Sequence, residues 1–267
     1  MQGHGATSGM LGVTDDLRRA VERFLIPRPT PVTPRDEELQ RQGTGLSLAC
    51  GLAATAWGDG PTVLLAHGWE SRRTHWGAFV PALVGAGFRA VAVDAPAHGD
   101  SPGEHANALQ YGLGLVEVGG EVGSLAGVVG HSFGAAAATI ALHRGLAADR
   151  AALISGPASL VAVIERWGRH HRISEAQIPT FVGLIAREVG VPIESLDLTR
   201  IAAGLNHPVL VVHDRGDDDI PVEEGLAVAA AWPGATTLVT ERYGHRRILI
   251  AREVVRAVVG FLKAGDA

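Results

Sequence analysis

Apolar residues along the chain alternate between short unbroken runs and segments in which they recur at helical spacing. The unbroken runs have the length of strands buried on both faces: Val63–Ala66, Ala90–Val93, Gly127–Val129 and Ala151–Ile154. Helices are predicted around Trp76–Leu83, within Ala106–Leu125 and over Ala135–Leu142. Strands of this kind that are separated by helices pair in parallel through right-handed crossovers. The pattern therefore predicts an α/β fold with a mostly parallel central sheet and helices on both faces.

The two ends of the chain extend this pattern. Residues 27–43 are rich in proline and then charged, which predicts an extended arm and a short polar helix. The apolar stretches 46–50 and 52–57 are broken at Gly51 and predict a hairpin of edge strands. After the fourth parallel strand, the remaining core elements are predicted as strand, helix, strand and helix at Val209–Val212, Glu223–Ala231, Thr237–Thr240 and Ile248–Leu262.

A long segment separates the predicted strands at 151–154 and 209–212. Apolar residues recur at helical spacing around Leu160–Trp167 and again around Phe181–Ile185, so this segment is predicted to be helical. We interpret residues 158–205 as a helical cap inserted over the carboxyl edge of the sheet, where open α/β folds bind ligands. The predicted organisation is an arm and lead-in helix over 1–45, this cap, and a core made of 46–157 and 206–267.

Composition narrows the classes of function. With 267 residues, 46% of them hydrophobic, the chain can bury a large core, which excludes intrinsic disorder. A net charge of −5 argues against nucleic acid and anionic membranes as partners. Cys50 is the single cysteine, so neither an intrachain disulfide nor a cysteine zinc cluster is expected. No export signal or apolar run of membrane-spanning length is visible, and we expect a cytoplasmic protein.

The sequence Gly130–His131–Ser132–Phe133–Gly134 matches the pattern G-x-S-x-G. It lies directly after a predicted strand and directly before a predicted helix, where a sharp turn exposes a serine hydroxyl above the sheet. Glycine at 130 and 134 allows the strand and helix backbones to approach each other. The alternative is a helix-capping serine after a glycine-rich turn, but the strand–turn–helix context favours Ser132 as a nucleophile.

A serine nucleophile needs a base, and the base needs an acid that orients it. His245 follows the last predicted strand and is the predicted base, whereas His131 and His213 are interpreted as packing or hydrogen-bonding histidines. The acid is expected on the loop after 209–212, because the loop after 151–154 carries no carboxylate. Four candidates compete on that loop: Asp214, Asp217, Asp218 and Asp219. A metal site there is disfavoured, because consecutive carboxylates do not easily all face one ion.

An oxyanion site completes the predicted chemistry. His67–Gly68–Trp69 follows the first parallel strand, and the backbone N–H of Trp69 is predicted to join that of Phe133 in holding a developing oxyanion. The alternative is a simple glycine turn. The chain order serine, acid, histidine, with each residue placed after a strand, makes coincidence a poor explanation.

These motifs, together with Asp94–Ala95–Pro96–Ala97–His98–Gly99–Asp100–Ser101, resemble the successive motifs of the α/β-hydrolase superfamily over about residues 46–263. The resemblance implies an α/β-hydrolase fold. It also implies that the acid is Asp217, because the family pattern H-G-x-x-D begins at His213, although Asp214 stands where the pattern usually has glycine. Haloalkane dehalogenases and epoxide hydrolases resemble the chain too, but they carry aspartate where this chain has Ser132.

Our hypothesis is a cofactor-independent serine hydrolase that cleaves carboxylic esters of small molecules through an acyl-enzyme. Thioesterase, C–C hydrolase, perhydrolase and acyltransferase reactions on the same three residues stay open, and so does a non-catalytic binding module of this fold. Trp69, Trp167 and Phe181 are the predicted substrate contacts. The basic segment 166–172 is interpreted as a solvated face, so charge reversal at Arg169 and Arg172 should leave neutral-ester rates unchanged. The sequence leaves a homodimer open.

Overall fold

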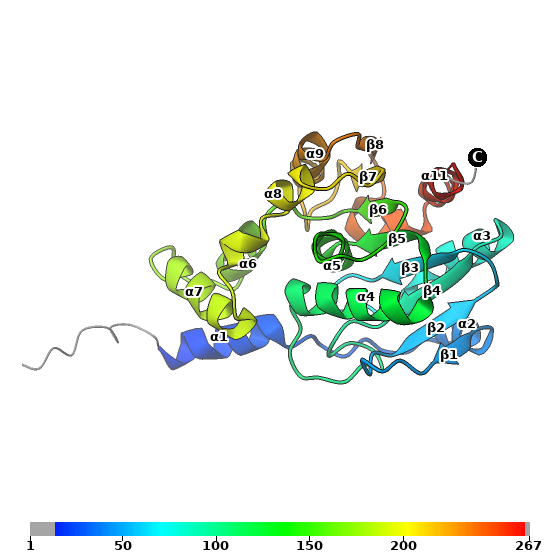
Figure 1. The fold of residues 1–267 in the computed structure, drawn as a ribbon. Helices are drawn as coiled ribbons and strands as arrows, with labels where there is room; N and C mark the ends of the chain where they lie inside the picture. The colour runs from blue at the N-terminus through cyan, green and yellow to red at the C-terminus, as the bar shows by residue number, and fades with distance from the viewer. Residues whose placement is uncertain (1–13, 265–267) are drawn as a thin grey trace, which may run out of the picture.

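The computed structural model describes residues 14–264, which contain an eight-stranded sheet (Figure 1). The strands lie in the order β1-β2-β4-β3-β5-β6-β7-β8. β3 to β8 pair in parallel, whereas β2 pairs antiparallel with both β1 and β4. The strand bounds are β1 Thr44–Leu46, β2 Ala54–Trp57, β3 Thr62–Ala66, β4 Arg89–Val93, β5 Leu125–His131, β6 Ala151–Ile154, β7 Val209–Asp214 and β8 Thr236–Thr240.

Both faces of the sheet are covered by helices. In β3, Leu64 and Ala66 belong to one apolar core and Val63 and Leu65 to the other, as alternation along a doubly buried strand requires. The first core is covered by α4 (Ala108–Val122), α5 (Phe133–His143), α8 (Leu198–Ala203) and α9 (Val222–Ala231). The second is covered by α3 (Phe79–Gly85) and α11 (Arg252–Lys263), with short helical turns at Arg73–Trp76, Gly244–Arg247 and Ile248–Ile250. The predicted fold class is confirmed.

A third apolar cluster lies outside the sheet layers. The segment after β6 forms α6 (Leu160–His170), α7 (Ile178–Val189) and the short turn Ile193–Leu196. These elements pack against α1 (Asp15–Leu25), which runs beneath them in Figure 1. The predicted lead-in helix corresponds to α2 (Pro34–Arg41), but α1 was not predicted. Within residues 14–264, no helix is both long enough and apolar enough to cross a membrane.

The edge hairpin differs from the prediction. Its strands are shorter than the apolar stretches suggested, because residues 47–53 lie outside both strands. The backbone N–H groups of Ala49 and Cys50 donate to the carboxylate of Glu121 on α4, at 2.8 and 3.4 Å, and Gly51 has a positive φ of 77°. A side chain 72 positions away from Ala49 along the chain thus holds this stretch as a turn.

Candidate active site

Ser132 lies in the turn between β5 and α5, with φ 53° and ψ −115°. Only a sharp turn brings the two elements this close, and both flanking glycines are needed for it. A Cβ at Gly130 would collide with the Gly134 carbonyl oxygen, and a Cβ at Gly134 would collide with the Ala66 carbonyl oxygen. The Ser132 N–H donates to the Ile154 carbonyl at 2.8 Å, which ties the turn to β6. Backbone strain of this kind costs roughly 1–3 kcal/mol and clusters at functional sites.

The structure brings Ser132, His245 and Asp217 together. His245 Nε2 lies 2.9 Å from Ser132 Oγ. His245 Nδ1 lies 2.8 Å from Asp217 Oδ2 and 3.0 Å from Oδ1. The Asp217 side chain is inaccessible to solvent and that of His245 is 11% exposed. This is an unbroken chain of hydrogen bonds from a buried carboxylate, through an imidazole, to a serine hydroxyl.

Asp217 is the carboxylate of its loop that contacts His245. Its Oδ1 also accepts the backbone N–H groups of Asp219 at 3.0 Å and Ile220 at 2.8 Å. His213 Nε2 donates to the Ile220 carbonyl at 2.9 Å and lies 3.3 Å from Asp217 Oδ2. Burial raises the pKa of Asp217, but the hydrogen bonds from His213 and His245 outweigh it and lower the pKa below its usual range. Asp217 is therefore a carboxylate at neutral pH.

Asp214, the nearest competitor, has a different set of partners. Its Oδ2 accepts the Thr240 hydroxyl at 2.6 Å and the N–H groups of Arg242 and Tyr243 at 3.0 and 2.9 Å. Burial alone would raise its pKa, but the hydrogen bonds from Thr240 and the Tyr243 backbone lower it to about 2. Asp214 thus holds the segment between β8 and His245. Asp218 and Asp219 are exposed.

Trp69 and Phe133, the predicted oxyanion residues, lie beside each other. Their rings meet edge to face with centroids 5.2 Å apart. A Cβ at Gly68 would lie 3.4 Å from Ser132 Cβ, so the loop after β3 passes directly beside the nucleophile turn. Within residues 14–264, the structure records no acceptor for the backbone N–H of either Trp69 or Phe133. The two N–H groups therefore remain the candidate donors to an oxygen bound beside Ser132.

Two buried histidines hold this loop. His67 Nε2 accepts the Ala95 N–H at 3.0 Å, and its Nδ1–H donates to the Gly68 carbonyl at 2.7 Å. His98 Nε2 accepts the Glu70 N–H at 3.1 Å. Burial lowers the pKa of both rings, so both stay neutral, as an imidazole nitrogen that accepts a hydrogen bond must be.

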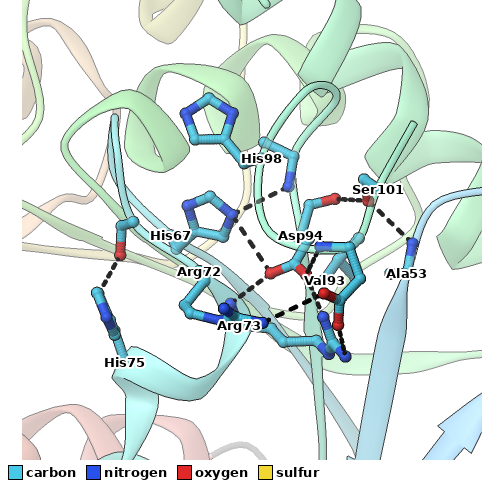
Figure 2. Close-up of polar contacts among 12 residues, drawn as sticks. Ala53, His67, Arg72, Arg73, His75, Val93, Asp94, His98 and Ser101 are labelled. Atoms are coloured by element: carbon cyan, nitrogen blue, oxygen red, sulfur yellow. Dashed lines mark hydrogen bonds and ion pairs between the residues drawn. The ribbon is translucent and has the colours of Figure 1, made fainter. Parts of the chain in front are cut away.

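Below them lies a buried ion-pair network that the sequence analysis did not predict (Figure 2). Asp94 pairs with the Arg73 guanidinium and accepts the Arg73 backbone N–H at 2.6 Å. The same guanidinium contacts Asp100 at 2.6 Å and Thr55 at 3.0 Å. The motif 94–101 was quoted for the resemblance, but no local signal marked Arg73 as its partner. Removing the Arg73 guanidinium would leave the buried Asp94 carboxylate without its cation.

Ser132 and His245 line a cavity of about 590 Å³, within the range of small-molecule sites. Trp69 and Trp167, two of the predicted substrate contacts, also line it. Phe181 does not, and this prediction needs correction. Its side chain is fully buried and stacks behind Trp167 at a centroid distance of 5.6 Å. Residues that line the cavity and residues that pack behind them recur at the same helical spacing. The sequence alone therefore could not show that Trp167 lines the cavity and that Phe181 does not.

The basic segment 166–172 has acidic partners. Arg166 pairs with Glu224 at 2.8 Å, and Arg169 pairs with Glu165 and Glu175 at 3.2 and 2.9 Å. Two of the positive charges of this segment are therefore paired within the protein, without a substrate. Within residues 14–264, no three His, Cys, Asp or Glu side chains are grouped so that they could hold a metal ion.

Comparison with solved structures shows the same fold at low sequence identity. An esterase from Pyrococcus furiosus matches with a TM-score of 0.67 and 21% identity over 90% of this chain and 97% of that one. A bromoperoxidase from Bacillus anthracis gives 0.63 and 19%, over 82% and 100%. A meta-cleavage product hydrolase from Pseudomonas fluorescens gives 0.62 and 17%, over 84% and 98%.

No curated protein matches the sequence significantly. The model of one family, described as the alpha/beta hydrolase family, matches residues 63–258, which include Ser132, Asp217 and His245. With more than half of its length matched, the chain belongs to the alpha/beta hydrolase family.

Proposed function

We propose that the protein is a serine hydrolase that cleaves carboxylic esters of small molecules through an acyl-enzyme intermediate. One observation carries this proposal: Asp217, His245 and Ser132 form a continuous hydrogen-bond chain that ends at a serine hydroxyl in the wall of a largely apolar cavity. The P. furiosus esterase, which shares this fold, supports the class of reaction.

In the acylation step, Ser132 Oγ attacks the ester carbonyl carbon while its proton passes to His245 Nε2. The Asp217 carboxylate at Nδ1 stabilises the imidazolium that forms and keeps the ring oriented. The carbonyl oxygen becomes an oxyanion and accepts hydrogen bonds from the N–H groups of Trp69 and Phe133, each worth roughly 3–4 kcal/mol. When the tetrahedral intermediate collapses, the C–O bond to the leaving alcohol breaks, and Nε2 returns the proton to that oxygen.

In the deacylation step, water takes the place of the alcohol. His245 Nε2 accepts a proton from the water while its oxygen attacks the acyl carbon. The second tetrahedral intermediate uses the same two N–H donors, and its collapse releases the acid and restores the Ser132 hydroxyl. α6 acts as part of a cap in this scheme, because it supplies Leu160, Val163, Ile164 and Trp167 to the cavity above the serine.

The test is turnover of p-nitrophenyl esters by the Ser132→Ala variant, with acyl thioesters and a peroxide-coupled assay run in parallel. We expect kcat to fall by several orders of magnitude with unchanged thermal unfolding. Ser124→Ala, which changes an exposed serine just before β5, is the control and should keep the wild-type rate. Ester turnover by Ser132→Ala at a near-normal rate would refute the proposal, and a preference for thioesters would change the substrate class.

A further inference from the structure

The cavity beside Ser132 has a wall that comes from outside the family-matched residues. Phe24 and Leu25 of α1 line it, although the match to the alpha/beta hydrolase family begins at residue 63. Figure 1 shows α1 beneath α6 and α7, running toward the start of α4. An N-terminal segment of this chain therefore contributes to the site that the family core and the 158–205 helices share.

Packing holds α1 firmly in this position. Leu17, Val21 and Leu25 lie at i, i+4 spacing and are buried against α7 and its neighbours. Phe24 is half-buried, and its ring meets Trp167 and Phe181 edge to face, at centroid distances of 5.4 and 6.1 Å. Edge-to-face contacts with two rings restrict the rotamers open to Phe24. Its ring is thus a defined part of the cavity wall.

Polar contacts fasten the end of α1 and the residues after it on two sides of the cavity. The Leu25 carbonyl accepts the Ala106 N–H at 2.9 Å, just before α4. Arg28 donates from its backbone N–H and its guanidinium to the Glu70 carboxylate, at 2.7 to 3.2 Å, and Thr30 Oγ donates to the Glu70 carbonyl at 2.8 Å. Glu70 directly follows Trp69, so the segment is tied to the loop that carries a proposed oxyanion donor.

The wall made by α1 and α6 suits an alkyl group. Their side chains in the cavity are all apolar, and they are Phe24, Leu25, Leu160, Val163, Ile164 and Trp167. The carboxylate of Glu70, which also lines the cavity, is engaged by Arg28. A hydrocarbon chain buried along such a wall gains free energy without leaving a polar group unpaired.

We infer that α1 is a structural part of the acyl-binding site and that Phe24 sets the preferred acyl length among esters with unbranched apolar acyl chains. This inference rests on the proposed ester hydrolysis for its kinetic consequence. In the wild type, kcat/KM rises by about fourfold per methylene, which corresponds to about 0.8 kcal/mol, until the chain reaches the ring of Phe24. Longer chains then lose this gain.

The experiment measures kcat/KM for p-nitrophenyl esters from acetate to laurate with Phe24→Ala and Phe24→Trp. The smaller side chain should move the maximum of the profile to longer acyl chains, and the larger one to shorter chains. Each profile is expressed relative to the acetate rate of the same variant, so that a uniform change in activity does not move its maximum. Leu113→Ala changes an exposed leucine of α4 outside the cavity and should leave the profile unmoved.

A second measurement is independent of catalysis. Unbranched methyl ketones of increasing length are titrated into the Ser132→Ala protein with and without each Phe24 substitution, and tryptophan fluorescence reports binding. We expect the length of the tightest ketone to move as the ester profile does. If esters are not hydrolysed at Ser132 but the length of the tightest-binding ketone still moves, Phe24 is confirmed as part of the cavity wall and the proposed function is wrong. If all lengths change by one common factor in both measurements, Phe24 does not set acyl length and the inference is wrong.

Discussion

Asp214 is the last residue of β7 and Asp217 lies three positions later on the loop that follows, but the two carboxylates bind different partners. Asp217 contacts the imidazole of His245, whereas Asp214 accepts one hydroxyl and two backbone N–H groups from the segment that leads to His245. The first carboxylate acts on the charge and orientation of the ring. The second holds the backbone that leads to His245. Substitutions of Asp217 and of Asp214 should therefore have different effects.

We predict that Asp217→Asn lowers kcat by about four orders of magnitude with little change in fold, because an amide cannot stabilise the imidazolium and can select the wrong tautomer. Asp214→Asn should instead lower the free energy of unfolding by about 1–3 kcal/mol, since it weakens buried hydrogen bonds. Ester kinetics and chemical denaturation of both variants check this. A larger loss of kcat in Asp214→Asn than in Asp217→Asn would contradict the assignment of Asp217 as the acid.

Local sequence was sufficient for some site residues and insufficient for others. Ser132 could be placed because it directly follows a recognisable strand, and His245 because it lies on the loop after the last one. The choice of Asp217 among four neighbouring carboxylates required a family pattern, since no local signal shows which of them faces a ring 28 positions away. Arg73 could not be found at all, because its partner Asp94 is joined to it only by the pairing of β2, β3 and β4 in space.

At the scale of elements, the position of Ser132 depends on how closely the start of α5 packs against the end of β3. Gly134 lies so close to the Ala66 carbonyl oxygen that any side chain there must push α5 away from β3. Gly120 on α4 serves as the matched control position, because no atom lies within 4 Å of the Cβ that a side chain there would add.

Gly134→Ala should therefore lower the free energy of unfolding by about 1–3 kcal/mol through overpacking, and it should also lower kcat by shifting Ser132. Gly120→Ala should raise stability by about 0.5–1 kcal/mol, because alanine loses less backbone entropy in a helix. Denaturant titration of the two variants compares them directly. Equal stability of both would show that the contact between α5 and β3 is not tight.

The sequence of strands and core helices along the chain could be predicted, because buried parallel strands are continuous apolar runs and helices repeat their apolar residues every three to four positions. Two elements show where this reasoning stops. The turn at residues 47–53 depends on Glu121, a contact that no local pattern reveals. α1 did carry a signal, with Thr14 as its cap, acidic residues in its first turn and Leu17, Val21 and Leu25 on one side, but its place in the cavity depends on packing against α7.

For the molecule as a whole, the buried histidines link stability to pH. Burial lowers the pKa of His131 to about 3, and it lowers that of His67 well below the ordinary value. In the unfolded chain these rings titrate near pH 6.5. Between these values the unfolded chain binds protons that the folded chain does not, so the free energy of unfolding falls as the pH falls.

We predict full stability above about pH 6.5 and a loss of about 2 kcal/mol from His131 at pH 5, with a further loss from His67 in the same direction. Below about pH 4, protonation of Asp214, whose pKa is lowered to about 2 in the fold, should add to the loss. Thermal unfolding at a series of pH values measures this. His131→Asn should reduce the slope between pH 6.5 and 5, and a wild-type melting temperature that is flat over this range would contradict the account.

Covalent labelling tests most directly whether the three distant side chains work as one unit. The protein is incubated with a fluorophosphonate, and the adduct is located by mass spectrometry in the wild type and in His245→Gln. The account predicts one adduct per chain, on Ser132, and labelling slower by orders of magnitude without the imidazole. An adduct on another residue, or equal labelling rates in the two proteins, would contradict it.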